Sequence, residues 1–271
     1  MIEAGDVRLI HGDCLDVMPT LAAGSVDLVV TSPPYDNLRT YNGAPPVDLT
    51  DVGRELFRVV KDGGVVVLVI QDQTRNFRKS ETSFRTIVDW CDAGFGLFEC
   101  LLYQRSGVPG AWWNGRFRVD HEYMPVFFKG KRPTYFDKSY LSIPAKLAGV
   151  TKTIPVRTTR GEVTRPESVT IAANKCRGTV WNYAVGGRGA LKNQHPATFP
   201  DELPRDHILC WTEPGALVLD PFSGSGTTGV ACVQTGRRYI GIERDPTYNA
   251  LAGERIACAR NECGLFAVEL P

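Results

Sequence analysis

The segment from residue 215 to 243 constrains the fold most, because it has the pattern of a strand, a glycine turn, a helix and a second strand. Residues 215–220 and 238–243 are rich in aliphatic residues, residues 224–226 read Gly-Ser-Gly, and residues 227–236 contain no Pro and end at Gly236. A strand, helix and strand in this order form a parallel pair with a crossover helix. The pattern predicts an α/β fold with a doubly wound, mostly parallel sheet.

Other elements follow from hydrophobic periodicity and from turn residues. Asp62-Gly63-Gly64 predicts a turn into 65–70, an aliphatic run typical of a central parallel strand. Residues 131–180 show no regular period, so we expect an irregular insertion there. The remaining predicted strands are 26–30, 95–103 and 122–128, and the remaining predicted helices are 48–60, 81–92, 204–211 and 246–261.

Composition excludes several classes of protein. The longest apolar run, 65–70, is too short to cross a membrane, and the first six residues contain no signal-like core, so a cytoplasmic location is expected. The 8 cysteines form no CxxC pair and the 4 histidines are scattered. We therefore expect reduced thiols and no metal site.

The charge is unevenly distributed along the chain. Residues 101–190 contain 15 Lys or Arg against 5 Asp or Glu, whereas the whole chain has a net charge of only +1. A basic middle section on an acidic remainder is typical of a surface that meets a polyanion, and a solvated loop region is the alternative.

The glycine turn predicts a nucleotide-like ligand. Glycines allow a ligand to approach the backbone at the carboxyl end of a strand. Glu243 ends the next strand, where its carboxylate can accept hydrogen bonds from two ribose hydroxyls. A nicotinamide-dinucleotide site is the competing interpretation, and a P-loop is excluded because no Lys follows Gly226.

Thr31-Ser32-Pro33-Pro34-Tyr35 is the second candidate site, at the end of a predicted strand. Two prolines fix the backbone and lack amide donors, so Ser32 and the Pro33 carbonyl form a rigid acceptor pair for an amino group. Tyr35 offers a flat face for stacking an extruded base. A strand-ending turn with a core tyrosine explains the same residues.

Together the two segments resemble the β class of DNA amino-methyltransferases, which has the catalytic motif before the cofactor motif. Ser32-Pro33-Pro34-Tyr35 is similar to the family's catalytic motif, and residues 220–228 (Asp-Pro-Phe-Ser-Gly-Ser-Gly-Thr-Thr) are similar to its cofactor motif. The resemblance implies a Rossmann-like methyltransferase fold, S-adenosylmethionine as cofactor, and catalytic roles for Ser32, Pro33, Pro34 and Tyr35. It implies cofactor contacts from Asp13, Thr31, Ser32, Thr198, Phe199, Asp220, Pro221, Phe222, Ser223, Gly224, Ser225, Gly226, Thr227 and Glu243.

The resemblance also implies double-stranded DNA as substrate, a homodimer, and either a solitary methylase or one half of a restriction-modification system. Residues 1–130 would form the catalytic half, 131–190 the target-recognition insertion, and 191–271 the cofactor-binding half. The candidate DNA contacts are Arg39, Arg105, Trp112, Trp113, Arg116, Arg118, Lys129 and Arg132.

The target base stays open at this level. The motif order favours adenine N6, whereas Ser32 in place of Asp is more typical of cytosine-N4 enzymes. Adenine is favoured narrowly, with cytosine N4 as the alternative. RNA or protein-glutamine methyltransferases usually have the reverse motif order, and an inactive DNA-binding protein would be expected to lack the acceptor pair or the cofactor carboxylate.

Overall fold

The computed structural model describes residues 7–34, 47–106, 117, 119–154, 167–184 and 200–266. The chain divides into two compact units. One contains the described residues up to Phe136 and from Thr179 onward, and the other is Asp137–Gly178. In the part of the chain that is described, no helix is long and apolar enough to cross a membrane.

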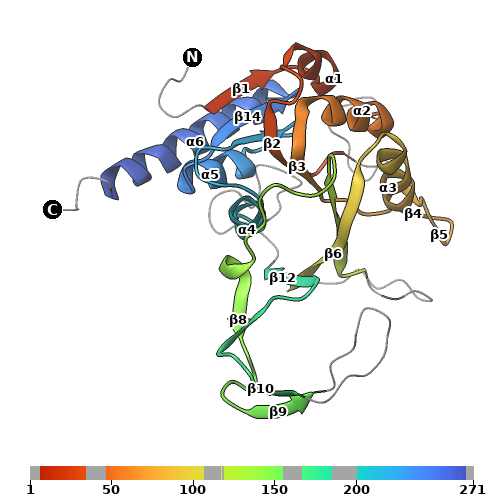
Figure 1. The fold of residues 1–271 in the computed structure, drawn as a ribbon. Helices are drawn as coiled ribbons and strands as arrows, with labels where there is room; N and C mark the ends of the chain where they lie inside the picture. Colours follow the sequence, from red (N-terminus) through yellow and green to blue (C-terminus); the bar gives the residue numbers. More distant parts are fainter. Residues whose placement is uncertain are drawn as a thin grey trace. The chain divides into compact units, whose positions relative to one another are not determined.

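The first unit is built on an eight-stranded sheet with the order β1-β14-β13-β2-β3-β7-β6-β12 (Figure 1). Neighbouring strands are parallel except where β7 pairs with β3 and β6. The strands are β1 Val7–His11, β2 Val26–Thr31, β3 Val60–Leu68, β6 Gly96–Ser106, β7 His121–Phe128, β12 Val180–Ala184, β13 Leu217–Asp220 and β14 Arg238–Glu243.

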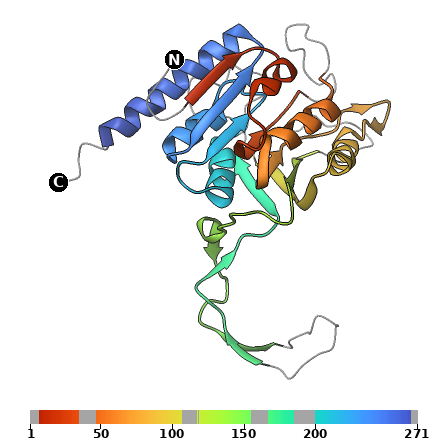
Figure 2. The same cartoon turned by 45° about the horizontal axis from the view of Figure 1, so that its top comes forward.

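Two groups of helices accompany this sheet (Figure 2). Helix α2 packs with α1 and α3, whereas α5 packs with α4 and α6. The predicted doubly wound, mostly parallel α/β architecture is confirmed. The helices are α1 Cys14–Val17, the 3-10 turn η1 Met18–Thr20, α2 Leu49–Val59, α3 Thr82–Asp92, α4 Glu202–Trp211, α5 Thr227–Gln234 and α6 Pro246–Phe266.

The core lies around the middle strands. Val29 of β2 and Val66 of β3 are fully buried, as is Trp90 of α3. β-Branched side chains suit a strand that is covered on both faces, which explains the continuous valine runs in β2 and β3. This rigid centre fixes the positions of the loops that follow each strand.

Asp62-Gly63-Gly64 was predicted as a turn before a strand, but these residues lie inside β3. Val26 pairs with Val60 and Leu28 with Val65, so β3 bulges between these two pairs. Gly63 has φ +80, which a bulge can require and which glycine adopts without strain. The bulge lets β3 start at Val60, directly after α2.

The sequence predicted an irregular insertion over residues 131–180, but the second unit contains regular strands. It contains two two-stranded antiparallel sheets, one of β8 (Ser142–Pro144) with β11 (Asn174–Cys176), the other of β9 (Thr151–Ile154) with β10 (Glu167–Thr170). The strands of the first sheet are exposed along their whole length. They therefore lack the alternation of apolar and polar residues that marks a half-buried strand.

Candidate active site

Four parallel strands bring the predicted site residues to one edge of the sheet. β1, β14, β13 and β2 are consecutive neighbours, and they end at His11, Glu243, Asp220 and Thr31 respectively. Ligands of open α/β folds bind outside this carboxyl edge. The loops that follow these four residues include both sequence motifs.

A buried hydrogen-bond network joins the two motifs. Thr31 Oγ1 donates to Asp220 Oδ1 at 2.7 Å, and Thr228 Oγ1 donates to Asp220 Oδ2 at 2.8 Å. The Phe222 amide also donates to Asp220, at 3.1 Å. Asp220 is 1% exposed, and burial raises the pKa of its carboxyl to about 6 although these hydrogen bonds lower it. The Asp220 side chain is therefore buried and engaged in holding the two motifs together.

The glycine turn takes its shape from backbone conformation and from close packing. Gly224 and Gly226 have φ +51 and +78. A Cβ on Gly226 would lie 2.8 Å from Ala252 of α6, and one on Gly229 would lie 2.7 Å from the Tyr239 ring. The spacing of residues 224, 226 and 229 also satisfies G-x-G-x-x-G, so the glycines alone do not separate this site from a dinucleotide site.

Glu243 faces this turn from the end of β14. Its Oε2 accepts from the Gly224 amide at 2.8 Å and its Oε1 accepts from the Asp245 amide at 2.8 Å. Each carboxylate oxygen has two acceptor positions, so both keep one for a ligand hydroxyl. The side chain is partly exposed, which leaves those positions accessible.

Asp13 lies beyond the end of β1, which pairs with β14 through His11 and Glu243. Its Oδ1 accepts from the Leu15 amide at 2.9 Å and caps α1, and its Oδ2 is 3.5 Å from Arg244 Nη1. Cys14 is buried beside it, and burial raises the pKa of this thiol to about 12, which makes it an inert core residue.

The predicted catalytic loop begins directly after β2. The Val69 amide donates to the Thr31 carbonyl at 2.8 Å, so the last residue of β2 is still held by the chain that continues β3. Ser32 and Pro34 are partly exposed and Pro33 is buried. The other predicted site residues Tyr35, Arg39, Trp112, Trp113, Arg116, Arg118, Thr198 and Phe199 lie outside the described residues.

The sequence interpretation missed Arg255 of α6. Its Nη1 donates to the Ser225 carbonyl at 2.6 Å, to Ser225 Oγ at 3.0 Å and to Thr227 Oγ1 at 3.1 Å. These hydrogen bonds fix the glycine turn to the neighbouring helix α6. Tyr239 also supports the turn, because its hydroxyl lies 2.9 Å from Ser223 Oγ. Pro221, Ser225 and Thr227 are buried, whereas Phe222 is partly exposed.

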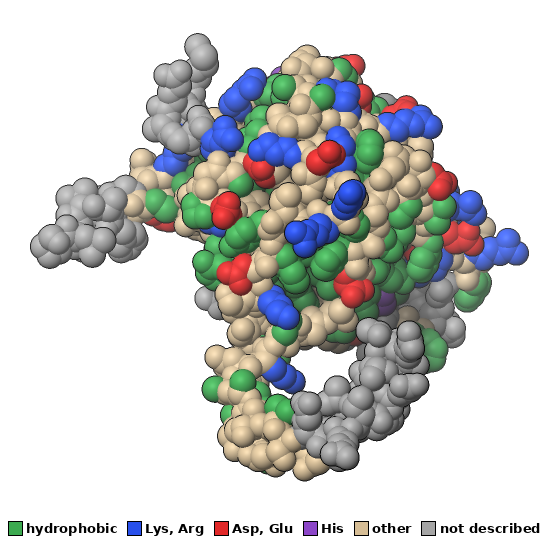
Figure 3. Space-filling model, viewed as in Figure 1, with side chains coloured by type: hydrophobic (Ala, Val, Ile, Leu, Met, Phe, Trp, Pro, Cys, Tyr) green, Lys and Arg blue, Asp and Glu red, His purple; other side chains and the backbone are tan. Residues whose placement is uncertain are grey.

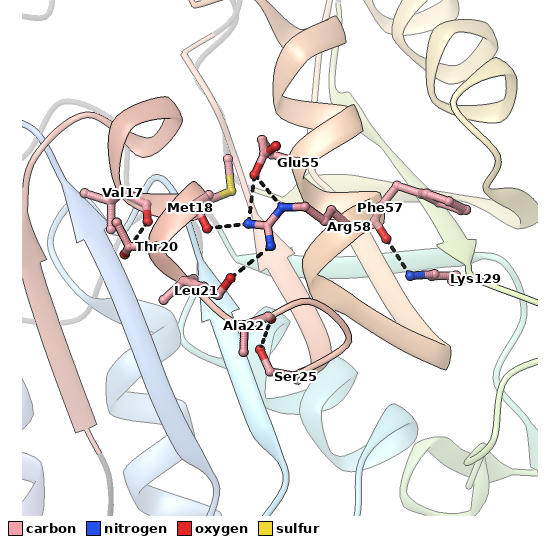
Figure 4. Close-up of polar contacts among 10 residues, drawn as sticks. All are labelled: Val17, Met18, Thr20, Leu21, Ala22, Ser25, Glu55, Phe57, Arg58 and Lys129. Carbon is pink, nitrogen blue, oxygen red and sulfur yellow. Dashed lines mark hydrogen bonds and ion pairs between the residues drawn. The ribbon is translucent and has the colours of Figure 1, made fainter.

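Lys129 is not a free cation, which weighs against its predicted role as a DNA contact. Its Nζ donates to the Phe57 carbonyl at 2.8 Å (Figure 4). It also donates to the Val60 carbonyl at 2.9 Å, at the end of α2. The same ammonium lies 4.8 Å from the Phe57 ring centroid. It therefore satisfies terminal helix carbonyls, which otherwise lack partners.

The other two described candidates for DNA contacts differ from each other. Arg105 donates to the Val119 carbonyl at 3.1 Å and lies 3.4 Å from Glu122 Oε1, with only 24% of its side chain exposed. Its charge is thus largely balanced within the protein. Arg132 is exposed and its guanidinium can meet a phosphate.

The residues at this edge fit an adenosine-containing ligand. The positive-φ glycine turn lets a ligand approach the backbone, Glu243 can accept from ribose hydroxyls, and partly exposed Phe222 can pack against a base. No group of three or more His, Cys, Asp or Glu side chains that could hold a metal occurs among the described ranges.

Comparison with known proteins agrees with this geometry. The family model for N6/N4 DNA methylases matches residues 26–254. The orphan methyltransferase M.BamHII of Bacillus amyloliquefaciens is 35% identical, covering 86% of this chain and 89% of its own. The type II methyltransferase M.Cfr9I of Citrobacter freundii is 32% identical over 94% and 89%. The DNA adenine methyltransferase YhdJ of Escherichia coli is 28% identical over 93% and 83%.

Solved structures share the fold. The cytosine-N4-specific PvuII DNA methyltransferase has a TM-score of 0.70 and 21% identity, over 95% of this chain and 92% of its own. A putative DNA modification methylase of Thermus thermophilus, complexed with S-adenosylmethionine, has a TM-score of 0.62 and 26% identity over 93% and 94%. The chain therefore belongs to the family of N6/N4 DNA methylases, which use S-adenosylmethionine as methyl donor.

Proposed function

We propose that this DNA methyltransferase methylates the exocyclic amine of an extruded base, and that the base is cytosine, at N4. The observation that carries the proposal is Ser32, a neutral, partly exposed hydroxyl at the end of β2, directly before two prolines. Ser32 would contact the amine itself, and serine at this position is more typical of cytosine-N4 enzymes than of adenine enzymes.

This choice reverses the narrow preference for adenine that the motif order gave. Motif order describes how the chain connects its strands, and the strands meet at one edge of the sheet whichever motif comes first. Motif order therefore does not act directly on which base is bound. Ser32, by contrast, would lie at the reacting amine, so its identity is the indication nearer to the substrate.

Adenine N6 is the second candidate. It is supported by the motif order and by the similarity to the DNA adenine methyltransferase YhdJ. Both candidates use the same acceptor pair, because each base presents an exocyclic amino group.

The residues of the site would work mainly by positioning. S-adenosylmethionine supplies a methyl group on an electrophilic sulfonium. Ser32 Oγ and the Pro33 carbonyl would accept hydrogen bonds from the amine and direct its lone pair at that methyl group, so that much of the acceleration comes from orientation. The same two oxygens would stabilise the positive charge that develops on the nitrogen until the surplus amine proton passes to solvent, and S-adenosylhomocysteine would remain as the second product. Glu243 would hold the ribose, and Asp13 the adenine amino group.

The second unit, Asp137–Gly178, lies within the 131–190 stretch that we propose as the target-recognition insertion. Its described cations include Lys146, Lys152 and Lys175, which can meet phosphates without reading sequence. We propose that this unit and, separately, the exposed guanidinium of Arg132 supply part of the DNA affinity.

Product analysis tests the proposed base. Mixed-sequence duplex DNA is incubated with the enzyme and S-adenosylmethionine, digested to nucleosides, and analysed by mass spectrometry. N4-methylcytosine is the expected product. N6-methyladenine alone would overturn the choice of base and support the second candidate. A Ser32→Ala variant, prepared in the same way, controls for contaminating methylases.

A further inference from the structure

A short hairpin lies at the same edge of the sheet as the catalytic loop. It consists of β4 (Thr74–Arg75) and β5 (Arg78–Lys79) and follows β3, which is parallel to β2 with Thr31 paired to Leu68. Residues 68 to 77 span at most about 32 Å of extended chain, which is less than one turn of B-DNA, about 34 Å. The hairpin and the catalytic loop can therefore contact the same turn of a duplex.

The tip of this hairpin is strained. Asn76 and Phe77 join the two strands, with φ +46 and +63. A two-residue turn with two positive φ values is typical of type I′, in which glycine normally follows asparagine. A bulky side chain in the left-handed region is an outlier, and Phe77 is nevertheless 72% exposed. The fold gains little burial from this residue, so its conformation points to a role outside the protein.

The positive charges of the hairpin repel one another and so do not stabilise the hairpin itself. Arg75 and Arg78 are directly paired across the strands and both are exposed. Like charges in opposite positions destabilise a sheet. With Lys79, they line one pocket whose other lining residues are Gln73, Asn76 and Ser80, none of them acidic. Figure 3 shows Lys and Arg side chains, with acidic atoms between them, at the right-hand margin, where Figure 1 draws β4 and β5.

The acidic residues nearest to the hairpin in the sequence are engaged with other partners. Glu81 Oε2 lies 2.7 Å from Arg85 Nη2. Asp72 is 5% exposed and its Oδ1 accepts from the Ser83 amide at 2.8 Å, in the first turn of α3. The base of the hairpin is fixed by the Ser80 amide, which donates to the Gln73 carbonyl at 2.9 Å. The hairpin is thus anchored to α3 with an aromatic tip between two arginines.

We propose that the β4–β5 hairpin is a DNA wedge. Phe77 enters the base stack within one helical turn of the extruded base, and Arg75 and Arg78 bind the flanking phosphates. Apolar wedges between base steps, framed by cations, are a known way of unstacking a duplex. The proposal rests on the DNA methyltransferase function but not on which base is methylated.

Phe77→Gly separates this role from a structural one. Glycine relieves the positive φ, so the melting temperature should rise by about 2 to 4 °C. DNA unwinding should fall at the same time. It is measured as the linking-number change of a plasmid relaxed by topoisomerase with the protein bound at equal occupancy. We expect about half the wild-type change or less. Equal unwinding, or a loss of unwinding together with a lower melting temperature, would overturn the wedge.

Arg75→Gln and Arg78→Gln test the phosphate contacts. Each should weaken binding to random-sequence duplex DNA and lower the slope of log affinity against log salt by about 1. Arg8→Gln is the matched control, because Arg8 is exposed near the amino end of β1, away from the catalytic edge. Unchanged slopes in both hairpin variants would contradict the proposal. Both measurements need no methylated product, so a wrong target base leaves their outcomes unaffected.

Discussion

Thr31 Oγ1 and Asp220 Oδ1 lie 2.7 Å apart although 189 positions separate the two residues in the chain. The bond joins the last residue of β2 to the last residue of β13, and both residues are almost completely buried. One residue precedes the proposed catalytic loop and the other begins the cofactor motif. The Thr31 hydroxyl and the Asp220 carboxylate therefore add a side-chain link between the proposed catalytic and cofactor sites to the backbone pairing of β2 with β13.

Thr31→Val should decrease stability and activity together. Valine fills the same space but leaves a buried carboxylate oxygen without one donor, which costs about 1–3 kcal/mol. The free energy of unfolding, from urea titration, should fall by this amount, and methyl transfer should decrease because the loop after β2 is less well fixed. Thr31→Ser keeps the hydroxyl and is the control. Equal stability of the valine and serine variants would contradict the role of the bond.

Asp220 should make stability decrease with rising pH over a defined range. Its folded-state pKa is raised from 3.8 to about 6, so between these values the folded state binds more protons than the unfolded state. Its contribution is therefore most favourable below pH 4 and is lost as the pH rises through 6, by up to about 3 kcal/mol. Asp220→Asn has no such titration. The unfolding free energy of the wild type minus that of the variant should therefore decrease between pH 4 and pH 7. A constant difference would contradict this assignment.

Some parts of the fold and site could be predicted from sequence because their signals are local. The strands β2 and β13 are short aliphatic runs, and each is followed by Pro or Gly residues that end it. Local composition therefore determined both the strands and the loops at their carboxyl ends. The parallel order of these strands then brought Thr31, Asp220 and Glu243 to one edge.

Other parts depend on long-range contacts, which leave no local signal. Lys129 looks like a surface cation, and only the fold brings it to the carbonyl of Phe57, 72 positions away. Arg255 reaches Thr227 across 28 positions from the middle of a helix. The strands of the β8–β11 sheet carry exposed side chains, so their pairing is fixed by the backbone and not by a hydrophobic pattern.

Ser32→Ala should strongly reduce methyl transfer while retaining the fold. Loss of one preorganised hydrogen-bond partner at a reacting atom typically lowers kcat about 100-fold or more. Tritium transfer from labelled S-adenosylmethionine to duplex DNA measures this, and calorimetry should show nearly unchanged cofactor affinity. Ser25→Ala is a matched control, since Ser25 immediately precedes β2 and donates to the Ala22 carbonyl at 2.7 Å. Near wild-type kcat in the Ser32 variant would exclude it from the catalytic role.

Glu243→Gln should weaken cofactor binding with a smaller effect on kcat. A hydrogen bond to a charged acceptor contributes about 1.5–3 kcal/mol, so the Kd for S-adenosylmethionine should rise about tenfold or more. Isothermal calorimetry measures this without any turnover. Glu254→Gln, an exposed position on α6, removes the same charge and should leave the Kd unchanged. Equal affinities for the two variants would show that Glu243 does not hold the ribose.

Lys129→Met should lower stability without changing how DNA binding depends on salt. The substitution keeps the apolar stem but leaves the carbonyls of Phe57 and Val60 without the ammonium, which bonds them at 2.8 and 2.9 Å. The loss should be about 1–2 kcal/mol in the free energy of unfolding. Because the ammonium is engaged inside the protein, it releases no counterion from DNA, and the slope of log affinity against log salt should equal that of wild type. Arg132→Gln is the contrasting variant: its guanidinium is exposed, so its stability should match wild type and its slope should fall by about 1 if it meets a phosphate. A reduced slope for Lys129→Met with unchanged stability would restore this lysine as a DNA contact.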